Sequence, residues 1–402
     1  MNPTLHSIFI QELEELCEKG LIRKLKSLSG HEGTRARWEG RELILFCGND
    51  YLGLSRHPQV IEKTIQALKT YGAGAGASRL ISGTSEVHSR LEKELAQFKR
   101  KEGALVFGSG YLANLGVLSA LAGEKDLIVM DKLSHASLID GARLSGASFR
   151  VFGHRRYEKC EEILKKSAAF SRRILVSDSV FSMDGDLADL DELVRLKEKY
   201  DCLLVIDDAH GIGVYGPEGR GATEGREEKI DFLVGTLSKS LGVFGGFVAA
   251  SGLLIDHVIN FSRPFIFATA PPAFMCQAAL EALYLIQKEP SLRAKLWSNV
   301  KEIERSLPGG MERTGGGPIF PLMIGDEKEA LQISEELLEK GIFIPAIRYP
   351  TVQKGKARLR LTVSARHTQE DLKQLHRHCE AVFKRMSPPP EADPPLAEKQ
   401  SL

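Results

Sequence analysis

The sequence of 402 residues contains no long apolar segment and no excess of charge of either sign. No stretch approaches the ~18 consecutive apolar residues of a membrane-spanning helix, so none is predicted. The first residues, MNPTLHSIFIQELEELCEKG, lack the basic start, apolar run and cleavage site of a secretory signal, and we expect a cytoplasmic protein. Lys plus Arg number 54 and Asp plus Glu number 53, which argues against a basic nucleic-acid-binding protein.

Paired cysteines are also absent. The six cysteines stand at positions 17, 47, 160, 202, 276 and 379, and no two form a CxxC pair. This spacing indicates neither a disulfide framework nor a zinc ribbon. Cys202 lies in an apolar run, and we expect it to be a small buried hydrophobic residue.

What the sequence does contain, over its central part, is an alternation of short apolar runs with amphipathic segments. Strands are predicted at 104–107, 127–130, 173–177, 202–206, 232–235 and 246–250. Helices are predicted at 57–69, 85–100, 112–121, 136–144, 160–167 and 189–199. Strands that alternate with helices are typical of an α/β fold with a largely parallel sheet covered on both faces.

The two ends of the chain differ from this pattern. An amphipathic helix at 8–26 and a short strand at 41–46 form a predicted N-terminal arm over residues 1–50, followed by a large α/β domain over 51–285. A long helical region at 273–306 leads into a smaller α+β domain over 286–386, with strands in PIFPLMIG, IFIPAI and ARLRLTV and helices at 328–340 and 369–385. The proline-rich residues 387–402 are predicted to be a disordered tail.

Two motifs point to chemistry that their context does not support. The segment GAGAGAS suggests a dinucleotide-binding turn, but such a turn follows a strand, and residues 64–71 upstream look helical. His376 and His378 stand two residues apart on a predicted helix, where they face different directions, so no metal site is expected there.

The segment LLVIDDAHG places acidic and imidazole side chains directly after a predicted strand. Asp207, Asp208 and His210 follow the apolar run, and ligands of open α/β sheets bind beyond the carboxyl ends of the strands. A carboxylate at such a place can pair with a protonated heterocyclic nitrogen. It can equally be a capping residue, and the pattern by itself leaves both interpretations open.

Lys239 lies in GTLSKSLGVFGG, among small hydroxyl residues and glycines. Partial burial would lower the pKa of its amine and make it nucleophilic, as Schiff-base lysines require. The alternative is an ordinary solvated lysine.

Two predicted helix starts add further candidates. In FGSGYLANLG the backbone N–H groups of Gly110 and Tyr111 would face a phosphate at the helix N-terminus. In DKLSHASLIDG, His135 could stack on a flat ring, or it could be a capping or core histidine. A carboxylate for a ring nitrogen, a lysine for an aldehyde, a phosphate site and a stacking imidazole together match the needs of pyridoxal 5′-phosphate.

Longer motifs extend this interpretation to a family. The chain resembles the α-oxoamine synthases, which are fold-type I pyridoxal-phosphate enzymes, in NDYLGLS, LISGTSEVHSRLEKELA, SGYLAN, DKLSHASLIDGARLS, VFSMDGDLADL, IDDAHGIGVYGPEGRG, GTLSKSLGVFGG and ARLRLTVSARHT. The resemblance spans roughly residues 20–385. It implies an aspartate-aminotransferase-like fold, with a large mostly parallel sheet domain and a small C-terminal α+β domain.

The same resemblance implies roles for the cofactor-binding residues. Lys239 would form the covalent Schiff base with pyridoxal 5′-phosphate and later move the Cα proton. Asp207 would pair with the pyridinium N–H, His210 would hydrogen-bond the ring oxygen, and His135 would stack on the ring. The residues expected to line the cofactor and its phosphate are Gly110, Tyr111, Ser182 and Thr236, with Thr269 reaching the phosphate of the neighbouring subunit.

For the substrates, the resemblance implies that Arg360 clamps the amino-acid carboxylate, since an arginine fork matches a carboxylate bidentately. Arg23, Asn49 and Thr351 would line the pocket. Through AIRYPTV at 346–352 and Arg23, the resemblance also implies L-alanine and a pimeloyl thioester as substrates, with coenzyme A or acyl carrier protein as the carrier.

The sequence leaves three other functions open. They are a glycine-using synthase such as a glycine C-acetyltransferase, a transaminase, and a non-catalytic scaffold. The resemblance further implies a homodimer, and neither a nucleic acid nor a membrane is expected as a partner.

Overall fold

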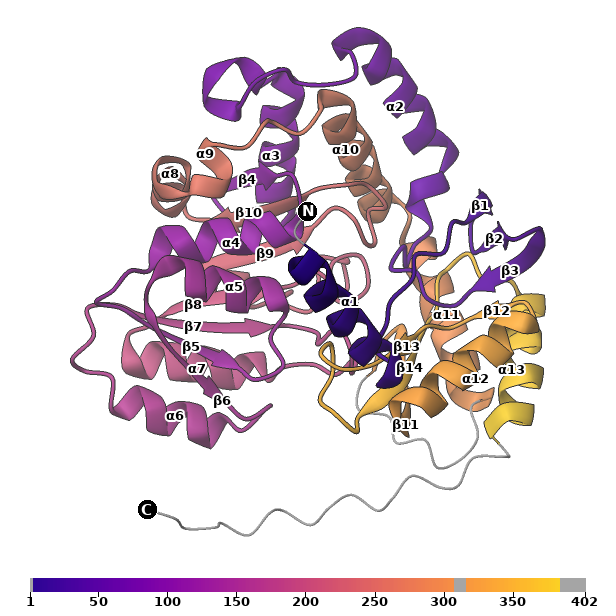
Figure 1. Ribbon diagram of the computed structural model, residues 1–402. Helices are drawn as coiled ribbons and strands as arrows, with labels where there is room; N and C mark the ends of the chain where they lie inside the picture. Colours follow the sequence, from indigo (N-terminus) through magenta and orange to yellow (C-terminus); the bar gives the residue numbers. More distant parts are fainter. Residues whose placement is uncertain (1–2, 307–315, 384–402) are drawn as a thin grey trace, which may run out of the picture.

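The computed structural model describes residues 3–306 and 316–383, and a seven-stranded sheet lies at its centre (Figure 1). In spatial order its strands are β4 (Gly103–Phe107), β10 (Gly246–Ala250), β9 (Phe232–Thr236), β8 (Leu203–Asp207), β7 (Arg173–Asp178), β5 (Leu127–Asp131) and β6 (Ser148–Phe152). Only β10 runs antiparallel to its neighbours. The remaining neighbours pair in parallel, which confirms the predicted sheet.

Helices cover both faces of this sheet. The helices of this part of the chain are α2 (Pro58–Tyr71), α3 (Glu86–Phe98), α4 (Gly110–Leu121), α5 (Ala136–Ser145), α6 (Tyr157–Lys165), α7 (Leu190–Tyr200), α8 (Gly252–Phe261), α9 (Arg263–Ile266) and α10 (Ala273–Lys288). Figure 1 shows α4 and α5 on one side and α6 and α7 on the other. The glycine-rich GAGAGAS follows helix α2 and not a strand, as predicted.

Strand β5 shows why the sheet is buried on both sides. All five of its residues are buried. Leu127 and Val129 pack with the core cluster that includes residues of α6 and α7, whereas Ile128 and Met130 pack with the cluster under α4 and α5. Successive side chains of a strand point to opposite faces, so a continuous apolar run is what a doubly covered strand needs. Cys202 is buried as predicted.

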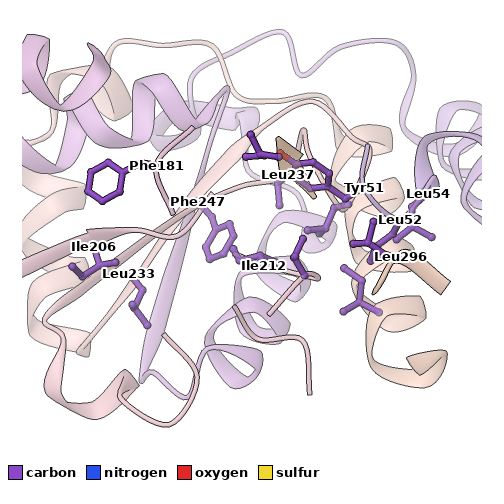
Figure 2. Close-up of a cluster of buried hydrophobic side chains, with 14 of the residues drawn as sticks. Tyr51, Leu52, Leu54, Phe181, Ile206, Ile212, Leu233, Leu237, Phe247 and Leu296 are labelled. Carbon is purple, nitrogen blue, oxygen red and sulfur yellow. The ribbon is translucent and has the colours of Figure 1, made fainter. Parts of the chain in front are cut away.

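The core continues from the sheet into the C-terminal part of the chain. Figure 2 shows apolar side chains from β8, β9 and β10 in one cluster with Tyr51, Leu52 and Leu54, and with Leu296 of α11 (Pro290–Ser306). The segment after Phe46 therefore lies between the large sheet and the C-terminal elements.

Two smaller sheets complete the structure. One contains β1 (Ser29–Glu32), β2 (Arg35–Trp38), β3 (Arg41–Leu45) and β12 (Ile342–Phe343), and the other contains β11 (Ile319–Gly325), β14 (Ala357–Thr362) and β13 (Ala346–Ile347). Helices α12 (Glu327–Glu339) and α13 (Gln369–Phe383) accompany them. Because β3 pairs with β12, the N-terminal strands join the C-terminal part of the chain.

Two predicted helices, one in the N-terminal arm and one before the C-terminal part, differ from the structure. The predicted helix at 8–26 is wrong at both ends, because α1 spans Pro3–Glu18 and Gly20, with φ 66°, donates its N–H to the Cys17 carbonyl and ends the helix. The long helical region at 273–306 is two helices, since Pro290 begins α11 after α10 has ended. The predicted tail at 387–402 lies outside the described residues.

Across the described ranges 3–306 and 316–383, no helix has both the length and the apolar character needed to cross a bilayer.

Candidate active site

Asp207 is the last residue of β8, at the carboxyl end of the sheet. Its Oδ2 accepts a hydrogen bond of 2.6 Å from Asn114 Nδ2, and its Oδ1 accepts one of 2.9 Å from the backbone N–H of Ala209. Asp207 is buried. The capping interpretation is therefore correct for one oxygen, while the other is oriented by a side chain of α4. This oriented carboxylate suits a protonated ring nitrogen.

Lys239 lies in the turn between β9 and β10 and is half-buried. The turn is closed by a 2.8 Å hydrogen bond from the Gly242 N–H to the Lys239 carbonyl. A Cβ on Gly242 would lie 2.3 Å from the Ser55 nitrogen, so only glycine permits this approach. Burial lowers the pKa of Lys239 to about 8, although Asp207 opposes the shift. The solvated interpretation is therefore wrong, and the amine is suited to Schiff-base chemistry.

Gly110 and Thr236 lie side by side at the start of α4. A Cβ on Gly110 would lie 3.3 Å from the Thr236 Cβ, and a Cβ on Gly246 would lie 2.3 Å from the Gly110 nitrogen. Ser109 caps the helix by accepting a hydrogen bond from the Leu112 N–H. The first-turn N–H groups have no intrahelical acceptors, and the helix dipole adds positive potential there. This glycine-lined helix start fits a phosphate group.

His135 precedes α5 and acts as its N-cap. Its Nδ1 accepts a 3.3 Å hydrogen bond from the Ser137 N–H and lies 2.7 Å from Ser137 Oγ, while the backbone N–H of His135 donates to Asp178 Oδ2 at 3.0 Å. Burial lowers the pKa of His135, with Asp207 opposing. The capping interpretation is thus correct, and it leaves a neutral flat ring that is available for stacking.

His210 is buried beside Tyr51, whose Oη lies 2.7 Å from His210 Nδ1. Burial and the nearby cations of Lys239 and Arg360 lower the pKa of His210 well below its ordinary value. Burial also raises the pKa of the Tyr51 phenol. Both groups are therefore neutral at neutral pH, and they form an uncharged hydrogen-bonding pair next to Lys239.

Arg360 comes from β14 and is almost fully buried. Its Nε donates to the Ser182 carbonyl at 2.6 Å, and its two Nη atoms each lie 3.2 Å from Asn49 Oδ1. In the part of the chain that the structure describes, Arg360 forms no ion pair with an acidic side chain. A buried guanidinium held by neutral acceptors suits the carboxylate of an amino acid. The solvated-strand interpretation of this residue is excluded.

Three of the predicted site residues, Arg23, Thr351 and Thr269, are not joined to this group, whereas a fourth, Tyr111, borders it. Arg23 donates to the Tyr349 carbonyl at 3.2 Å, and the Thr351 N–H donates to the Arg348 carbonyl at 3.0 Å, so both lie at the 348–351 turn. Thr269 is exposed and pairs with Ser78 in an isolated β-bridge. Tyr111 is 42% exposed and its hydroxyl donates to Asp140, while its ring lies edge-on to that of His135 with the centroids 6.4 Å apart. Their binding roles stay predictions.

Asn114, Asp178 and Tyr51 also belong to the site but were not predicted as site residues. Asn114 and Tyr51 lie inside the motifs SGYLAN and NDYLGLS. Asp178 ends β7, next to β8, and burial and Asp207 raise its pKa well above the ordinary range. Its position at the carboxyl end of a neighbouring strand was an available signal.

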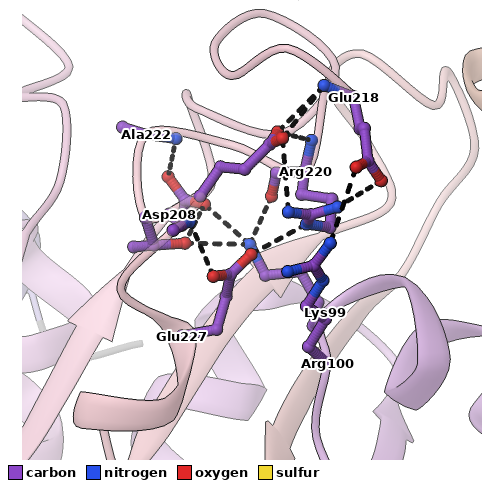
Figure 3. Close-up of polar contacts among 10 residues, drawn as sticks. Lys99, Arg100, Asp208, Glu218, Arg220, Ala222 and Glu227 are labelled. Atoms are coloured by element: carbon purple, nitrogen blue, oxygen red, sulfur yellow. Dashed lines mark hydrogen bonds and ion pairs between the residues drawn. The ribbon is translucent and has the colours of Figure 1, made fainter.

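Asp208 belongs to a second network of buried polar contacts (Figure 3). Its Oδ2 lies 2.9 Å from Lys99 Nζ and accepts a 3.0 Å hydrogen bond from Thr223, and its Oδ1 accepts one of 2.6 Å from Ser179. Lys99 also donates to the Arg220 carbonyl. Asp208 therefore anchors the loop that follows β8 and carries His210.

The chain shows clear similarity to known proteins. A family model described as aminotransferase class I and II matches residues 41–378. The chain is 42% identical over 391 residues to an 8-amino-7-oxononanoate synthase from Thermoanaerobacter pseudethanolicus, which covers 96% of this chain and 99% of that protein. It is 43% identical over 384 residues to a protein of the same name from Citrifermentans bemidjiense, at 94% and 98% coverage.

A solved structure agrees with these relatives in fold. Serine palmitoyltransferase from S. paucimobilis, with a bound PLP–myriocin aldimine, superposes with a TM-score of 0.89 at 30% identity. The match covers 96% of this chain and 98% of that one.

Proposed function

The chain belongs to the aminotransferase class I and II family, and we propose that it is a pyridoxal-phosphate-dependent acyltransferase of the α-oxoamine synthase type. It condenses L-alanine with a pimeloyl thioester, releases carbon dioxide and the thiol, and forms 8-amino-7-oxononanoate for biotin biosynthesis. The names of the curated relatives support this substrate pair. The observation that carries the proposal is the lowered pKa of Lys239, which interacts electrostatically with both the Asp207 carboxylate and the Arg360 guanidinium. Within the described residues, Arg360 itself forms no ion pair with an acidic side chain.

The residues of the site fit the cofactor, because the Gly110 helix start, the oriented Asp207 oxygen and the neutral His135 ring match its phosphate, ring nitrogen and ring face. When bound, pyridoxal phosphate supplies an electron sink for negative charge at the amino-acid Cα. Asp207 would hold the ring nitrogen of the cofactor, and His135 would lie against its ring. The first turn of α4, beside Thr236, would bind its phosphate.

Arg360 binds the alanine carboxylate and so orients the Cα–H bond toward Lys239. The Lys239 amine, unprotonated in part at neutral pH, removes the Cα proton and later returns one. The alanine Cα attacks the acyl carbonyl carbon and the thiol leaves. Loss of carbon dioxide from the resulting β-keto acid follows. Asn49 and Tyr51 connect Arg360 to His210. Asn49 Oδ1 accepts from Arg360 at 3.2 Å and from the Tyr51 hydroxyl at 3.3 Å, and that hydroxyl lies 2.7 Å from His210 Nδ1.

We further propose that two copies of the chain associate. Large apolar side chains are exposed over several neighbouring segments: Ile61, Ile65, Leu68, Leu80, Ile81, Phe244 and Phe267. An exposed apolar surface of this kind is typical of an interface. Thr269 is exposed close to Phe267, where it can meet the phosphate of a second copy.

Two further proposals concern organisation and location. The division into an arm over 1–50, a large domain over 51–285 and a small domain over 286–386 assigns Arg360 to the small domain and Lys239 to the large one. A cytoplasmic location suits an enzyme that uses soluble thioesters of coenzyme A or acyl carrier protein.

A substrate panel tests the proposed reaction. The purified holoenzyme is given L-alanine or glycine with pimeloyl, acetyl or palmitoyl thioesters, and released thiol is measured. We expect the highest kcat/KM with L-alanine and a pimeloyl thioester, and no thiol release from Lys239→Ala. Release with glycine and acetyl-CoA alone would assign the chain to the glycine C-acetyltransferases.

A further inference from the structure

His154 lies between two loops that each carry part of the proposed active site. It follows β6 in the segment FGHRRYE. Its Nδ1 lies 3.0 Å from Asp131 Oδ1, and its Nε2 lies 2.7 Å from Asp186 Oδ2. The two carboxyl side chains are only 1% and 4% exposed, whereas the imidazole is 25% exposed. An imidazole that donates from both ring nitrogens carries a positive charge.

On one side, His154 acts on the loop that positions His135. Asp131 ends β5, and its Oδ1 also accepts a 2.8 Å hydrogen bond from the Leu133 N–H, two residues before His135. Its Oδ2 accepts a hydrogen bond of 3.0 Å from the Arg155 N–H. The Asp131 carboxylate therefore joins the His154 segment to the beginning of the His135 loop.

On the other side, His154 acts on the tight turn at 180–187. Val180 and Leu187 form an isolated bridge across this turn, and the Phe181 N–H donates to the Asp186 carbonyl at 2.9 Å. The Phe181 ring packs edge-on against His154, with the ring centroids 4.4 Å apart. The turn is thus held to His154 by one polar and one aromatic contact.

The same turn supports both arginines of β14. The Ser182 carbonyl accepts the 2.6 Å hydrogen bond from Arg360 Nε, and Asp184 pairs with Arg358. A shift of the turn relative to β5 would therefore move the guanidinium of Arg360 relative to the ring of His135.

We propose that His154 is a positioning residue, whose doubly hydrogen-bonded imidazolium fixes the distance between the His135 loop and the turn that supports Arg360. In the reaction it aligns the amino-acid carboxylate with the ring of the cofactor. The inference rests on the proposed function for the identity of the substrate, but its geometry rests on the contacts of His154 alone.

The charge of His154 sets a pH range for this role. Burial opposes protonation, but the hydrogen bonds to Asp131 and Asp186 raise the pKa of His154 to about 9. The other groups around it are Arg155, whose Nη1 lies 3.7 Å from Asp186, and Tyr157, whose pKa burial raises to about 12. Because the pKa of His154 is raised in the folded protein, its stabilisation of the two loops is complete below the ordinary pKa of 6.5. This stabilisation is lost as the pH rises through about 9.

The test uses His154→Gln in the holoenzyme, with Arg156→Gln as the matched control. Arg156 lies in the same segment, but it is exposed, and among the described residues its guanidinium pairs only with Glu158. The dissociation constants of L-alanine and glycine are measured from the change in the visible band of the bound cofactor. We expect His154→Gln to raise them about tenfold at pH 7.5, with the cofactor retained. The difference in dissociation constant between His154→Gln and the wild type should become smaller towards pH 10, where wild-type His154 also loses its positive charge.

Wild-type dissociation constants in His154→Gln at pH 7.5 would overturn the proposal. Asp186→Asn is a second variant that keeps His154 and Arg360, and it should raise the constants in the same direction. In the apoenzyme, NMR of 13C-labelled histidines should show one resonance that titrates near pH 9. Titration of every histidine near or below pH 6.5 would also overturn the inference. If the wild-type enzyme binds L-alanine but releases no thiol, the proposed function is contradicted, whereas the positioning role of His154 is not.

Discussion

Asn114 and Asp207 form a buried hydrogen bond of 2.6 Å between the first turns of α4 and the end of β8. The second amide hydrogen of Asn114 reaches Ser137 Oγ at 2.9 Å, at the start of α5. One side chain thus joins the helix start proposed to bind phosphate, the carboxylate proposed to bind the ring nitrogen, and the helix that follows His135. Three parts of the site depend on a single amide.

Replacement of Asn114 by Ala should lower kcat/KM for L-alanine by about tenfold or more, because Asp207 loses its orienting donor. The dissociation constant of the cofactor should rise as well, which equilibrium dialysis can measure. Asn260→Ala is the control, since the exposed Asn260 side chain donates to the Asp256 carbonyl of its own helix and to no other group in the described part of the chain. Equal kinetics in both variants would show that Asp207 needs no support from α4.

Lys239 has a pKa of about 8, and this predicts the pH dependence of cofactor attachment. Only the unprotonated amine attacks an aldehyde. The rate at which apoenzyme and pyridoxal phosphate form the bound visible band should therefore rise up to about pH 8 and then level off. A rate that still rises tenfold per pH unit between about pH 8.5 and 9.5 would indicate an ordinary lysine. Lys239→Arg, which cannot form the bond, should show no such band at any pH.

Gly246 lets β10 begin against the backbone of Gly110. A methyl group there would lie 2.3 Å from the Gly110 nitrogen, so Gly246→Ala should displace the start of α4 and weaken retention of the cofactor. When the cofactor-loaded Gly246→Ala variant is passed through a gel-filtration column, much of its cofactor should separate from the protein. Gly123→Ala makes the same chemical change in open space and should retain the cofactor fully. Retention that is equal in the two variants would argue against phosphate binding at this helix start.

His367 couples the stability of the fold to acid. It stacks on Phe46 at 4.1 Å, and its Nδ1 accepts a 2.9 Å hydrogen bond from the Ser364 N–H. Burial lowers the pKa of His367 to about 4. A buried neutral histidine resists protonation, so the free energy of unfolding should fall as the pH drops from about 6.5 to 4, by up to about 3 kcal/mol.

His367→Phe separates this effect from the titration of carboxylates. It keeps the stacking on Phe46 but cannot titrate. In urea unfolding of the apoenzyme, the destabilisation by His367→Phe should be larger at pH 7 than at pH 4.5. A difference that does not change with pH would contradict the lowered pKa of His367.

The sequence predicted those parts of the molecule that local pattern determines. Continuous apolar runs such as that of β5 identified the buried strands, and the strand end at Asp207 identified the site. Strand β6 was not predicted, because Arg150 interrupts its apolar pattern and the strand lies at the edge of the sheet, with its central residues exposed.

Other features depend on tertiary contacts that no local pattern reveals. The role of Asp178 follows from the pairing of β7 with β8, and the burial of Arg360 follows from the approach of β14 to the 180–187 turn. The hydrogen bonds of His154 to Asp131 and Asp186 join three segments that are distant in the sequence. Their side chains are ordinary until the fold places them together.

The release of labelled carbon dioxide distinguishes a decarboxylative condensation from the other reactions of this cofactor. The holoenzyme is incubated with L-alanine labelled with 13C at its carboxyl carbon and a pimeloyl thioester, and the thiol and the labelled carbon dioxide are measured together. We expect equal amounts of both, with neither formed by Lys239→Ala. Label that stays in the amino acid or appears in pyruvate would contradict a decarboxylative condensation and would favour a transaminase.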